Sequence, residues 1–211
     1  ICWVKRTYKN DALISNSGKG FFDLPSGAVL GTSSIRRRAQ ILNLRKDLNI
    51  KLLRGNVDTR INKLRKGQFD AIILSLAGIK KLNLDDQITE VLDLENFLPA
   101  ACQGAVGVQA KRNSKFKKLF DDVNDLKTEI ECISERNILN IIGASCNSPV
   151  SVEANIDKEE LTINVELFNH DGKKIYKEKF IDRKENYIQL TTSVGKNILD
   201  SVGKDVIYKL S

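Results

Sequence analysis

Short apolar runs separated by amphipathic segments dominate the first half of the chain and predict an α/β fold. From residue 28 to about residue 97, the pattern predicts the order strand, helix, strand, helix, strand, helix. The run from Phe69 to Leu74 suits a parallel strand that is covered on both faces. Residues 10–27 are rich in Ser, Gly, Asn and Asp, and they predict a loop-bearing connector.

The second half of the chain follows a different pattern. Apolar residues recur at steps of three to five between residues 119 and 141, which predicts one or two helices. Two hairpins are predicted next, from residues 150–156 paired with 161–168, and then 174–182 after a His-Asp-Gly turn. Residues 188–206 predict a final amphipathic helix. This half is therefore interpreted as a smaller α+β domain.

The composition is that of a globular chain with enough apolar residues for real cores. The 211 residues are 41% hydrophobic, which allows one large or two ordinary domains, and the apolar runs are too short to span a bilayer. A formal net charge of +7 keeps nucleic-acid binding open as an alternative function. Against it, only 6% of residues are aromatic, and the arginines cluster at strand ends and helix starts. A non-catalytic module that binds small anions is a further alternative.

The cysteines differ in what their surroundings indicate. They lie at positions 2, 102, 132 and 146 without CxxC spacing, and His170 is the single histidine, which argues against a zinc site and favours reduced thiols. Cys102 is interpreted as a small packing residue. Cys146 lies in a turn of small residues, 143–150, between a long helical pattern and a strand. Such a turn can hold a thiol exposed and tethered.

Arginines stand at the start of a helix that is predicted to follow a Gly-Thr-Ser-Ser turn. Thr32, Ser33 or Ser34 can serve as the N-cap, so that free backbone N–H groups point beyond the end of the preceding strand. Arg36 and Arg37 lie in the first turn, where each positive charge is unfavourable by roughly 0.3–1 kcal/mol. We therefore expect a negatively charged ligand to offset this cost.

A second segment repeats the arrangement. An apolar run ends in Arg54-Gly55-Asn56, and the helix predicted after it carries Arg60 in its first turn. In open α/β sheets, ligands bind outside the carboxyl ends of strands, where both groups of arginines would project. Because a guanidinium pairs bidentately with carboxylates and phosphates, two convergent sets indicate a ligand with several negative charges.

Five segments together carry a resemblance to a known family, in the family's order and spacing. They are Gly31-Thr32-Ser33-Ser34-Ile35-Arg36-Arg37, Arg54-Gly55-Asn56-Val57-Asp58-Thr59-Arg60, Asp70-Ala71-Ile72-Ile73-Leu74, Gln103-Gly104-Ala105-Val106-Gly107 and the turn around Cys146. In these segments the chain resembles the porphobilinogen deaminases, also called hydroxymethylbilane synthases. The resemblance runs from about residue 2 past residue 150.

The resemblance implies a transferase of haem biosynthesis that joins four porphobilinogen molecules into the linear tetrapyrrole hydroxymethylbilane and releases ammonia. It also implies a dipyrromethane cofactor, held by a thioether to Cys146. Every pyrrole ring carries an acetate and a propionate, so the resemblance implies residues that bind carboxylates: Ser33, Ser34, Arg36, Arg37, Arg54, Arg60 and Lys81. A cleft is implied with the lining residues Thr32, Gly55, Asn56, Gln103 and Gly104.

The resemblance further implies an α/β domain like that of periplasmic binding proteins, followed by a smaller α+β domain that carries the cofactor cysteine. Residues 1–9 would be the end of a first domain and a hinge, 10–97 the second domain, 98–122 a segment returning to the first domain, and 123–211 the C-terminal domain. The family's catalytic aspartate belongs to a His-Ser-x-Lys-Asp segment that would precede residue 1. No catalytic residue is therefore assigned, and the chain alone is expected to be inactive.

The resemblance also sets expectations for partners and location. The implied partners are porphobilinogen and the growing polypyrrole chain, without nucleic acid, membrane or metal, and the complete enzyme is expected to be a monomer. The implied location is the cytoplasm or a plastid-type organelle, with any targeting segment before residue 1.

Overall fold

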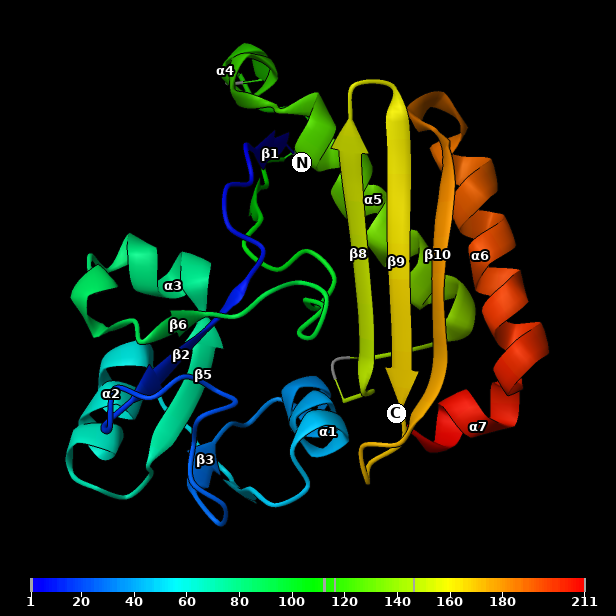
Figure 1. Ribbon diagram of the computed structural model, residues 1–211. Coiled ribbons are helices and arrows are strands. Elements are labelled where there is room, and N and C mark those ends of the chain that lie inside the picture. Colours follow the sequence, from blue (N-terminus) through cyan, green and yellow to red (C-terminus); the bar gives the residue numbers. More distant parts are fainter. Residues whose placement is uncertain (1, 112, 116, 146, 211) are drawn as a thin grey trace.

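A computed structural model describes residues 2–111, 113–115, 117–145 and 147–210, which form three β-sheets with helices packed against the two larger ones (Figure 1). The strands are β1 (Cys2–Val4), β2 (Asp11–Ser15), β3 (Val29–Gly31), β4 (Asn49–Lys51), β5 (Ala71–Ser75), β6 (Glu90–Val91), β7 (Val106–Val108), β8 (Val150–Asp157), β9 (Glu160–Phe168) and β10 (Lys174–Arg183). The α-helices are α1 (Ile35–Leu44), α2 (Val57–Arg65), α3 (Leu76–Lys81), α4 (Lys117–Val123), α5 (Leu126–Ile142), α6 (Tyr187–Val202) and α7 (Lys204–Lys209). Two short 3₁₀ helices, η1 (Asp85–Gln87) and η2 (Lys184–Asn186), complete the set. No helix in these ranges is long and apolar enough to cross a membrane.

The larger sheet has the strand order β4-β3-β5-β2-β6 and is buried on both faces. Strand β3 runs parallel to β4 and β5, whereas β2 runs antiparallel to β5 and β6. Successive residues of β5 enter different cores: Ile73 packs with Ile41 of α1, and Ile72 packs with Ile61 of α2 and Ile79 of α3. Helices therefore cover both faces, as expected for a sheet built from continuously apolar strands. The predicted alternation of strands and helices after residue 28 is confirmed.

The prediction for residues 10–27 is wrong in its first part. Residues 11–15 form β2, an interior strand whose first four residues are buried. The apolar run of Ala12, Leu13 and Ile14 is short, and the Ser, Gly and Asn residues after it dominate the composition of the segment. Because β2 is antiparallel to β5, the expectation of a purely parallel environment for β5 holds only on its β3 side. Strand β2 also places Asp11 inside the molecule.

The smaller sheet, β10-β9-β8, is antiparallel and carries α5 and α6 against one face (Figure 1). Residues alternate along β8, so that Val152 and Ala154 enter the core shared with Ile138 of α5 and Ile198 of α6. Both predicted hairpins are confirmed. The predicted final helix is interrupted, because Gly203 ends α6 and α7 follows it.

Helix α5 is capped at both ends by its own sequence. Asp125 is the N-cap, and its side chain accepts a hydrogen bond from the N–H of Thr128 at 2.8 Å. Gly143 ends the helix in the left-handed conformation with φ of 70°. The turn that contains Cys146 begins immediately after this cap, but Cys146 itself lies outside the described residues.

A buried ion network fastens the segment that enters β2 to the smaller sheet. Nη2 of Arg6 lies 2.7 Å from Glu131 and 2.9 Å from Glu135, and all three side chains are at most 2% exposed. The same carboxylates accept the N–H groups of Ala154 and Ile156, at 2.9 and 3.0 Å. Two glutamates of α5 therefore pair with the terminal nitrogens of the buried guanidinium and with two N–H groups at the free edge of β8.

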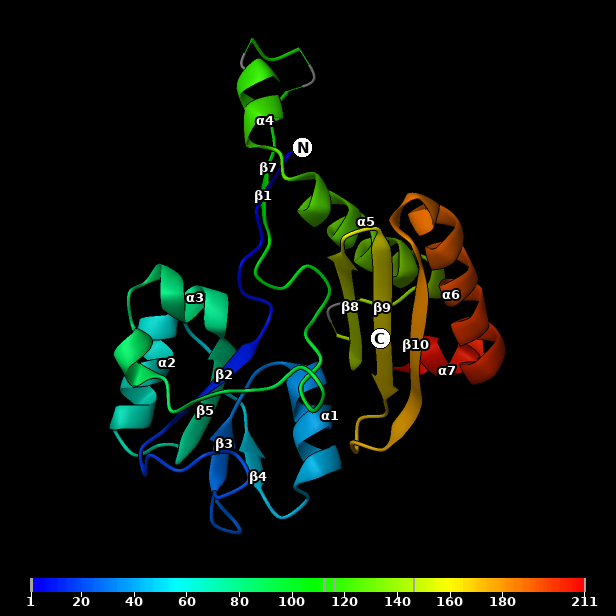
Figure 2. The same ribbon diagram turned by 45° about the horizontal axis from the view of Figure 1, so that its top comes forward.

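Two segments connect the larger sheet to the pair of strands β1 and β7: one runs from β1 to β2 and the other from β6 to β7. The two segments lie together. Strands β1 and β7 pair antiparallel, with Trp3 opposite Gly107, and Figure 2 shows them running side by side toward α4. Near them, Gly104 has φ of 78°, and a Cβ atom there would stand 1.9 Å from the carbonyl oxygen of Tyr8. Only glycine permits this approach.

Replacement of Glu135 by Gln should destabilise the fold strongly, because it leaves the Arg6 guanidinium buried without its full counter-charge. Removal of one partner from a buried ion pair costs about 3–5 kcal/mol. The control is Lys127→Gln on the same helix, since Lys127 is 55% exposed and lies 3.8 Å from Glu131. Urea unfolding should show a loss of about 3 kcal/mol for the first variant and under about 1 kcal/mol for the second. Equal losses would contradict the role given to Glu135.

Candidate functional site

Asp11 holds the two arginines that begin α1. Its Oδ2 accepts a hydrogen bond from Nη2 of Arg36 at 2.8 Å, and its Oδ1 accepts one from Nη2 of Arg37 at 2.7 Å. The Asp11 side chain is fully buried, and those of Arg36 and Arg37 are 5% and 10% exposed. Ser34 is the N-cap of the helix, as expected for one of the three candidates. The counter-charge within the chain was missed by the sequence interpretation, which named only a ligand.

One carboxylate between two guanidiniums leaves an excess positive charge. Burial by itself raises the pKa of Asp11, but attraction and hydrogen bonds from Arg36 and Arg37 outweigh it and lower the pKa to about 2. Burial, with a smaller contribution from repulsion by Arg37, lowers the pKa of Arg36 despite its contact with Asp11. Asp11 is therefore ionised at neutral pH, and the arginines still repel each other.

Gln103 connects this ion cluster to the segment that follows the larger sheet. Its Oε1 accepts a hydrogen bond from Nη2 of Arg36 at 3.2 Å, and its Nε2 donates to Asp11 at 2.8 Å and to the carbonyl of Lys9 at 2.7 Å. Arg36 also donates to Gln40 and to the carbonyl of Leu98. Gln103, which was predicted to line a cleft, is thus a structural partner of Arg36 and Asp11.

A hollow of about 540 Å³ lies beside Arg37, at the carboxyl ends of β4 and β5. Its lining includes Gly55, Asn56, Val57, Asp58, Arg60, Leu74, Ser75, Gly78 and Leu82. Gly55 has φ of 121°, and a Cβ atom there would stand 2.8 Å from the side chain of Thr59. Its carbonyl accepts a hydrogen bond from Nε of Arg60 at 2.6 Å, which fixes the direction of that guanidinium. This position outside the strand ends is the one expected for ligands of open α/β sheets.

The electrostatics of the hollow favour an anion. Burial, and then repulsion from Arg37, lower the pKa of Arg60. Among the described residues, Arg60 gives one hydrogen bond to a protein acceptor and Arg37 gives two from its guanidinium, of the five N–H groups that each side chain carries. The remaining donors suit a carboxylate or phosphate.

The other predicted site residues are spread over a wider surface. Ser33 and Arg54 are exposed, whereas Thr32 is buried and its hydroxyl accepts the N–H of Ser34 at 3.1 Å. Lys81 is exposed and lines a separate hollow of about 640 Å³ together with Gly104. The structure thus brings together Arg37, Gly55, Asn56 and Arg60 in one hollow, whereas Arg36 and Gln103 are hydrogen-bonded to each other and do not line it. The placement of Cys146 lies outside the described residues.

A larger hollow, about 910 Å³, lies against the outer face of the smaller sheet and is a weaker candidate. Two of its three lining lysines have acidic partners there: Lys9 lies 2.9 Å from Glu153, and Lys177 lies 3.1 Å from Glu166. A multiply charged anion would have to compete with these carboxylates. The hollow lined by Arg37 and Arg60, from here on the arginine hollow, is smaller but carries unmatched positive charge.

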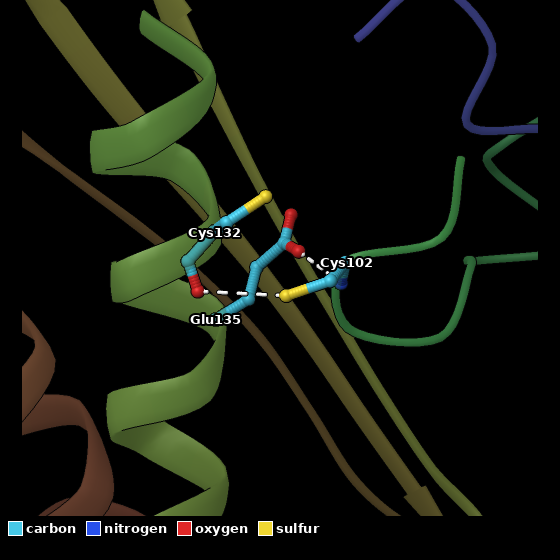
Figure 3. Close-up of side chains that lie close together, drawn as sticks. All are labelled: Cys102, Cys132 and Glu135. Carbon is cyan, nitrogen blue, oxygen red and sulfur yellow. Dashed lines mark hydrogen bonds between the residues drawn. The ribbon is translucent and has the colours of Figure 1, made fainter. Parts of the chain in front are cut away.

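One cluster in the described ranges has the residue types of a metal site. Cys102, Cys132 and Glu135 each offer a ligand atom, and these atoms all lie within 4.8 Å of one another (Figure 3). The Glu135 carboxylate is already engaged by Arg6 and by the N–H groups of Cys102 and Ala154. The spacing of the cysteines gave no sign of this proximity.

Sequence interpretation also missed the charged residues that support the site. Asp11, Arg6 and Glu135 belong to no recognised motif, and each finds its partner far along the chain. Only Asp11 had a usable signal in the sequence. An acidic residue directly before a short apolar run can be the first residue of a strand that begins in a polar site. Nothing in the local pattern around Arg6 or Glu135 indicates burial.

Known proteins match this chain along most of its length. Residues 1–118 match the family described as "Porphobilinogen deaminase, dipyromethane cofactor binding domain", and residues 129–200 match "Porphobilinogen deaminase, C-terminal domain". The porphobilinogen deaminase of Campylobacter jejuni is 38% identical over 207 residues, covering 97% of this chain and 67% of the relative. That of Nitratiruptor sp. is 38% identical over 211 residues, covering 98% and 67%.

Among solved structures, a putative methionine-binding lipoprotein of Bacillus subtilis aligns with a TM-score of 0.41 and 16% identity, covering 60% of this chain and 61% of the other. A similarity at that level carries no weight here. The curated relatives decide the matter, and the chain spans about two thirds of their length. The matched families and relatives show that this chain belongs to the porphobilinogen deaminase family, the dipyrromethane-dependent enzymes of tetrapyrrole synthesis.

Proposed function

We propose that the residues of this chain serve the polymerisation of four porphobilinogen molecules into hydroxymethylbilane by holding the carboxylates of the pyrroles in the arginine hollow. The single observation that carries the proposal is that the guanidinium side chains of Arg37 and Arg60 line one hollow in which Asp58 is the one acidic lining residue. A pyrrole with an acetate and a propionate provides the missing negative charges. The proposal extends to Ser33, Ser34, Arg54 and Lys81 as outlying contacts of a longer chain.

The donor set fits the dipyrromethane cofactor of the family. Nε of Arg36 and Nε of Arg37 are buried and have no hydrogen-bond partner in the described part of the protein, and Arg60 lines the hollow with Nε alone bonded to a protein acceptor. Guanidinium groups bind carboxylates through such donors, which makes Arg37 and Arg60 the residues that would hold the acidic side chains of the cofactor. When bound, the cofactor supplies the pyrrole carbon to which the first substrate unit is joined.

The proposed attachment residue is Cys146, which follows the Gly143 cap of α5 in the sequence. The contact between Nε2 of Gln40 and the hydroxyl of Ser151, at 3.1 Å, supports this assignment. Gln40 lies one turn after Arg36 on α1, and Ser151 lies in β8, shortly after the Cys146 turn. The contact ties the start of β8 to the helix that carries the arginines.

Asp11 is proposed to position the arginines and to take no part in proton transfer. Both of its oxygens accept hydrogen bonds from guanidinium groups, and a pKa of about 2 keeps it ionised at neutral pH. A general acid or base needs a pKa nearer the working pH. The proton transfers of the reaction are therefore not assigned to Asp11.

The larger sheet, with helices on both faces and a hollow at its strand ends, supports the proposal that this unit is built like the domains of periplasmic binding proteins. In that arrangement a ligand sits outside the carboxyl ends of the strands. Arg37 and Gly55 follow β3 and β4 along the chain, and both line the hollow.

Replacement of Arg60 by Gln should weaken the binding of porphobilinogen by about 10- to 100-fold, because a hydrogen bond to a charged group contributes roughly 1.5–3 kcal/mol. Arg65→Gln is the matched control, since Arg65 lies on the same helix and donates to Gln87 at 2.7 Å, away from the hollow. Isothermal titration calorimetry with porphobilinogen measures both variants. The same dissociation constant for the two variants would argue against the arginine hollow as the site.

Replacement of Asp11 by Asn should give a stability difference that depends on pH. The folded-state pKa of about 2 lies below the unfolded value of about 3.9, so the stabilisation by Asp11 is fully present above about pH 4 and is lost as pH falls toward 2. Unfolding by urea between pH 7 and pH 2.5 should show the difference from wild type shrinking below about pH 4. Asp200→Asn, at an exposed position of α6, controls for the loss of a charge. A difference that is constant over the whole pH range would contradict the ion-pair assignment.

A further inference from the structure

Two cysteines from distant parts of the chain meet beside the ion network. Cys102 lies in the turn between the larger sheet and β7, with φ of 59°, and Cys132 lies on α5. Their sulfur atoms are within 4.8 Å of each other, and the Cys102 thiol donates to the carbonyl oxygen of Cys132 at 3.6 Å. Figure 3 shows the Cys102 side chain directed at helix α5, with Glu135 beside it.

The two thiols differ in access and in acidity. Cys102 is half-buried, whereas Cys132 is fully buried. The interaction with the Cys132 thiol lowers the pKa of the Cys102 thiol, with smaller contributions from Arg136 and Arg6, against burial and Glu135, which raise it. The same interaction between the two thiols, and burial, raise the pKa of the Cys132 thiol. Cys102 therefore has the properties of an attacking thiolate, and Cys132 those of the thiol that resolves the product.

The surroundings do not suit a metal ion at this cluster. A third ligand would have to come from Glu135, whose two oxygens accept four hydrogen bonds, two of them from Arg6. The Arg6 guanidinium already neutralises this carboxylate, and a cation would have to displace it. The thiol pair remains as the reactive part of the cluster.

We propose that Cys102 and Cys132 are a redox modification site, at which a peroxide converts the two thiols into an intramolecular disulfide. The Cys102 thiolate attacks hydrogen peroxide, takes up one oxygen to become a sulfenic acid, and releases water after protonation. The Cys132 thiol then attacks the Cys102 sulfur, and the hydroxyl group leaves as a second water. The two thiols lose two electrons and two protons in total, and the peroxide accepts both.

Closing the bond requires a sulfur to sulfur distance of about 2.05 Å, so the side chains must turn toward each other. The turn around Cys102 can adjust because it is only half-buried, whereas α5 is held by its caps and core. The disulfide would tie this turn to α5 next to Gln103, which bridges Arg36 and Asp11. The disulfide at Cys102 would thus affect Arg36 and Asp11 through the neighbouring residue Gln103. It stands on the cysteine geometry alone and does not depend on the proposed function.

The experiment treats the complete, reduced chain with hydrogen peroxide, blocks the remaining thiols with iodoacetamide, and maps tryptic peptides without reduction. Cys102 falls in peptide 82–111 and Cys132 in peptide 128–136. The expected product is these two peptides joined, two hydrogens lighter than their sum, and separated again by dithiothreitol. The peptide 137–158, which contains Cys146, is followed separately.

Two variants sharpen the assignment. Cys132→Ser should leave Cys102 as a sulfenic acid that dimedone traps, because the resolving thiol is gone. Cys2→Ser is the matched control, since Cys2 is also buried but is not part of the cluster, and it should form the joined peptide as wild type does.

Two results would overturn the proposal. The first is wild-type Cys102 carrying dimedone or additional oxygens without any joined peptide. The second is tight binding of one Cd²⁺ per reduced chain that protects both Cys102 and Cys132 from iodoacetamide, which would make the cluster a metal site. Because the wild-type map requires no substitution, the test does not depend on whether a variant folds.

Discussion

The carboxylate of Asp11, buried between the guanidiniums of Arg36 and Arg37, is the interaction on which the site depends. Two unpaired guanidiniums at the start of α1 would cost several kcal/mol each to bury. One carboxylate offsets part of that cost and connects β2 to α1, while Gln103 extends the connection to the next segment. The remaining positive charge is not a defect of the fold, because it gives the adjacent hollow its preference for anions.

A second buried ion network connects the segment before the larger sheet to helix α5 of the smaller sheet. Arg6, Glu131 and Glu135 hold the segment before β2 against α5, and the glutamates also satisfy N–H groups at the edge of β8. The two networks lie within a few residues of each other in sequence, at the start of the chain and at Asp11. The relative position of the larger and the smaller sheet therefore depends on charge pairing as well as on hydrophobic packing.

Local patterns were sufficient for much of the fold and not for its long-range contacts. The strands and helices after residue 28 and both hairpins were predictable, because hydrophobic period and turn residues act over a few positions. Strand β2 was missed since its apolar run is short and polar residues follow it. The convergence of Arg37 and Arg60 was predictable from strand-end topology, whereas Asp11 as a counter-charge and the meeting of Cys102 with Cys132 require tertiary contacts that no local pattern contains. The role of Cys146 and the domain boundaries stay predictions.

In the proposed function, this chain anchors a dipyrromethane at Cys146 and holds its carboxylates with arginines that Asp11 positions. The denatured intact mass of the purified protein, followed by peptide mapping, tests this most directly. The account predicts an excess equal to two linked pyrrole units, located on the tryptic peptide 137–158 and missing from a Cys146→Ala variant. The same excess retained by that variant, or located on another peptide, would contradict it.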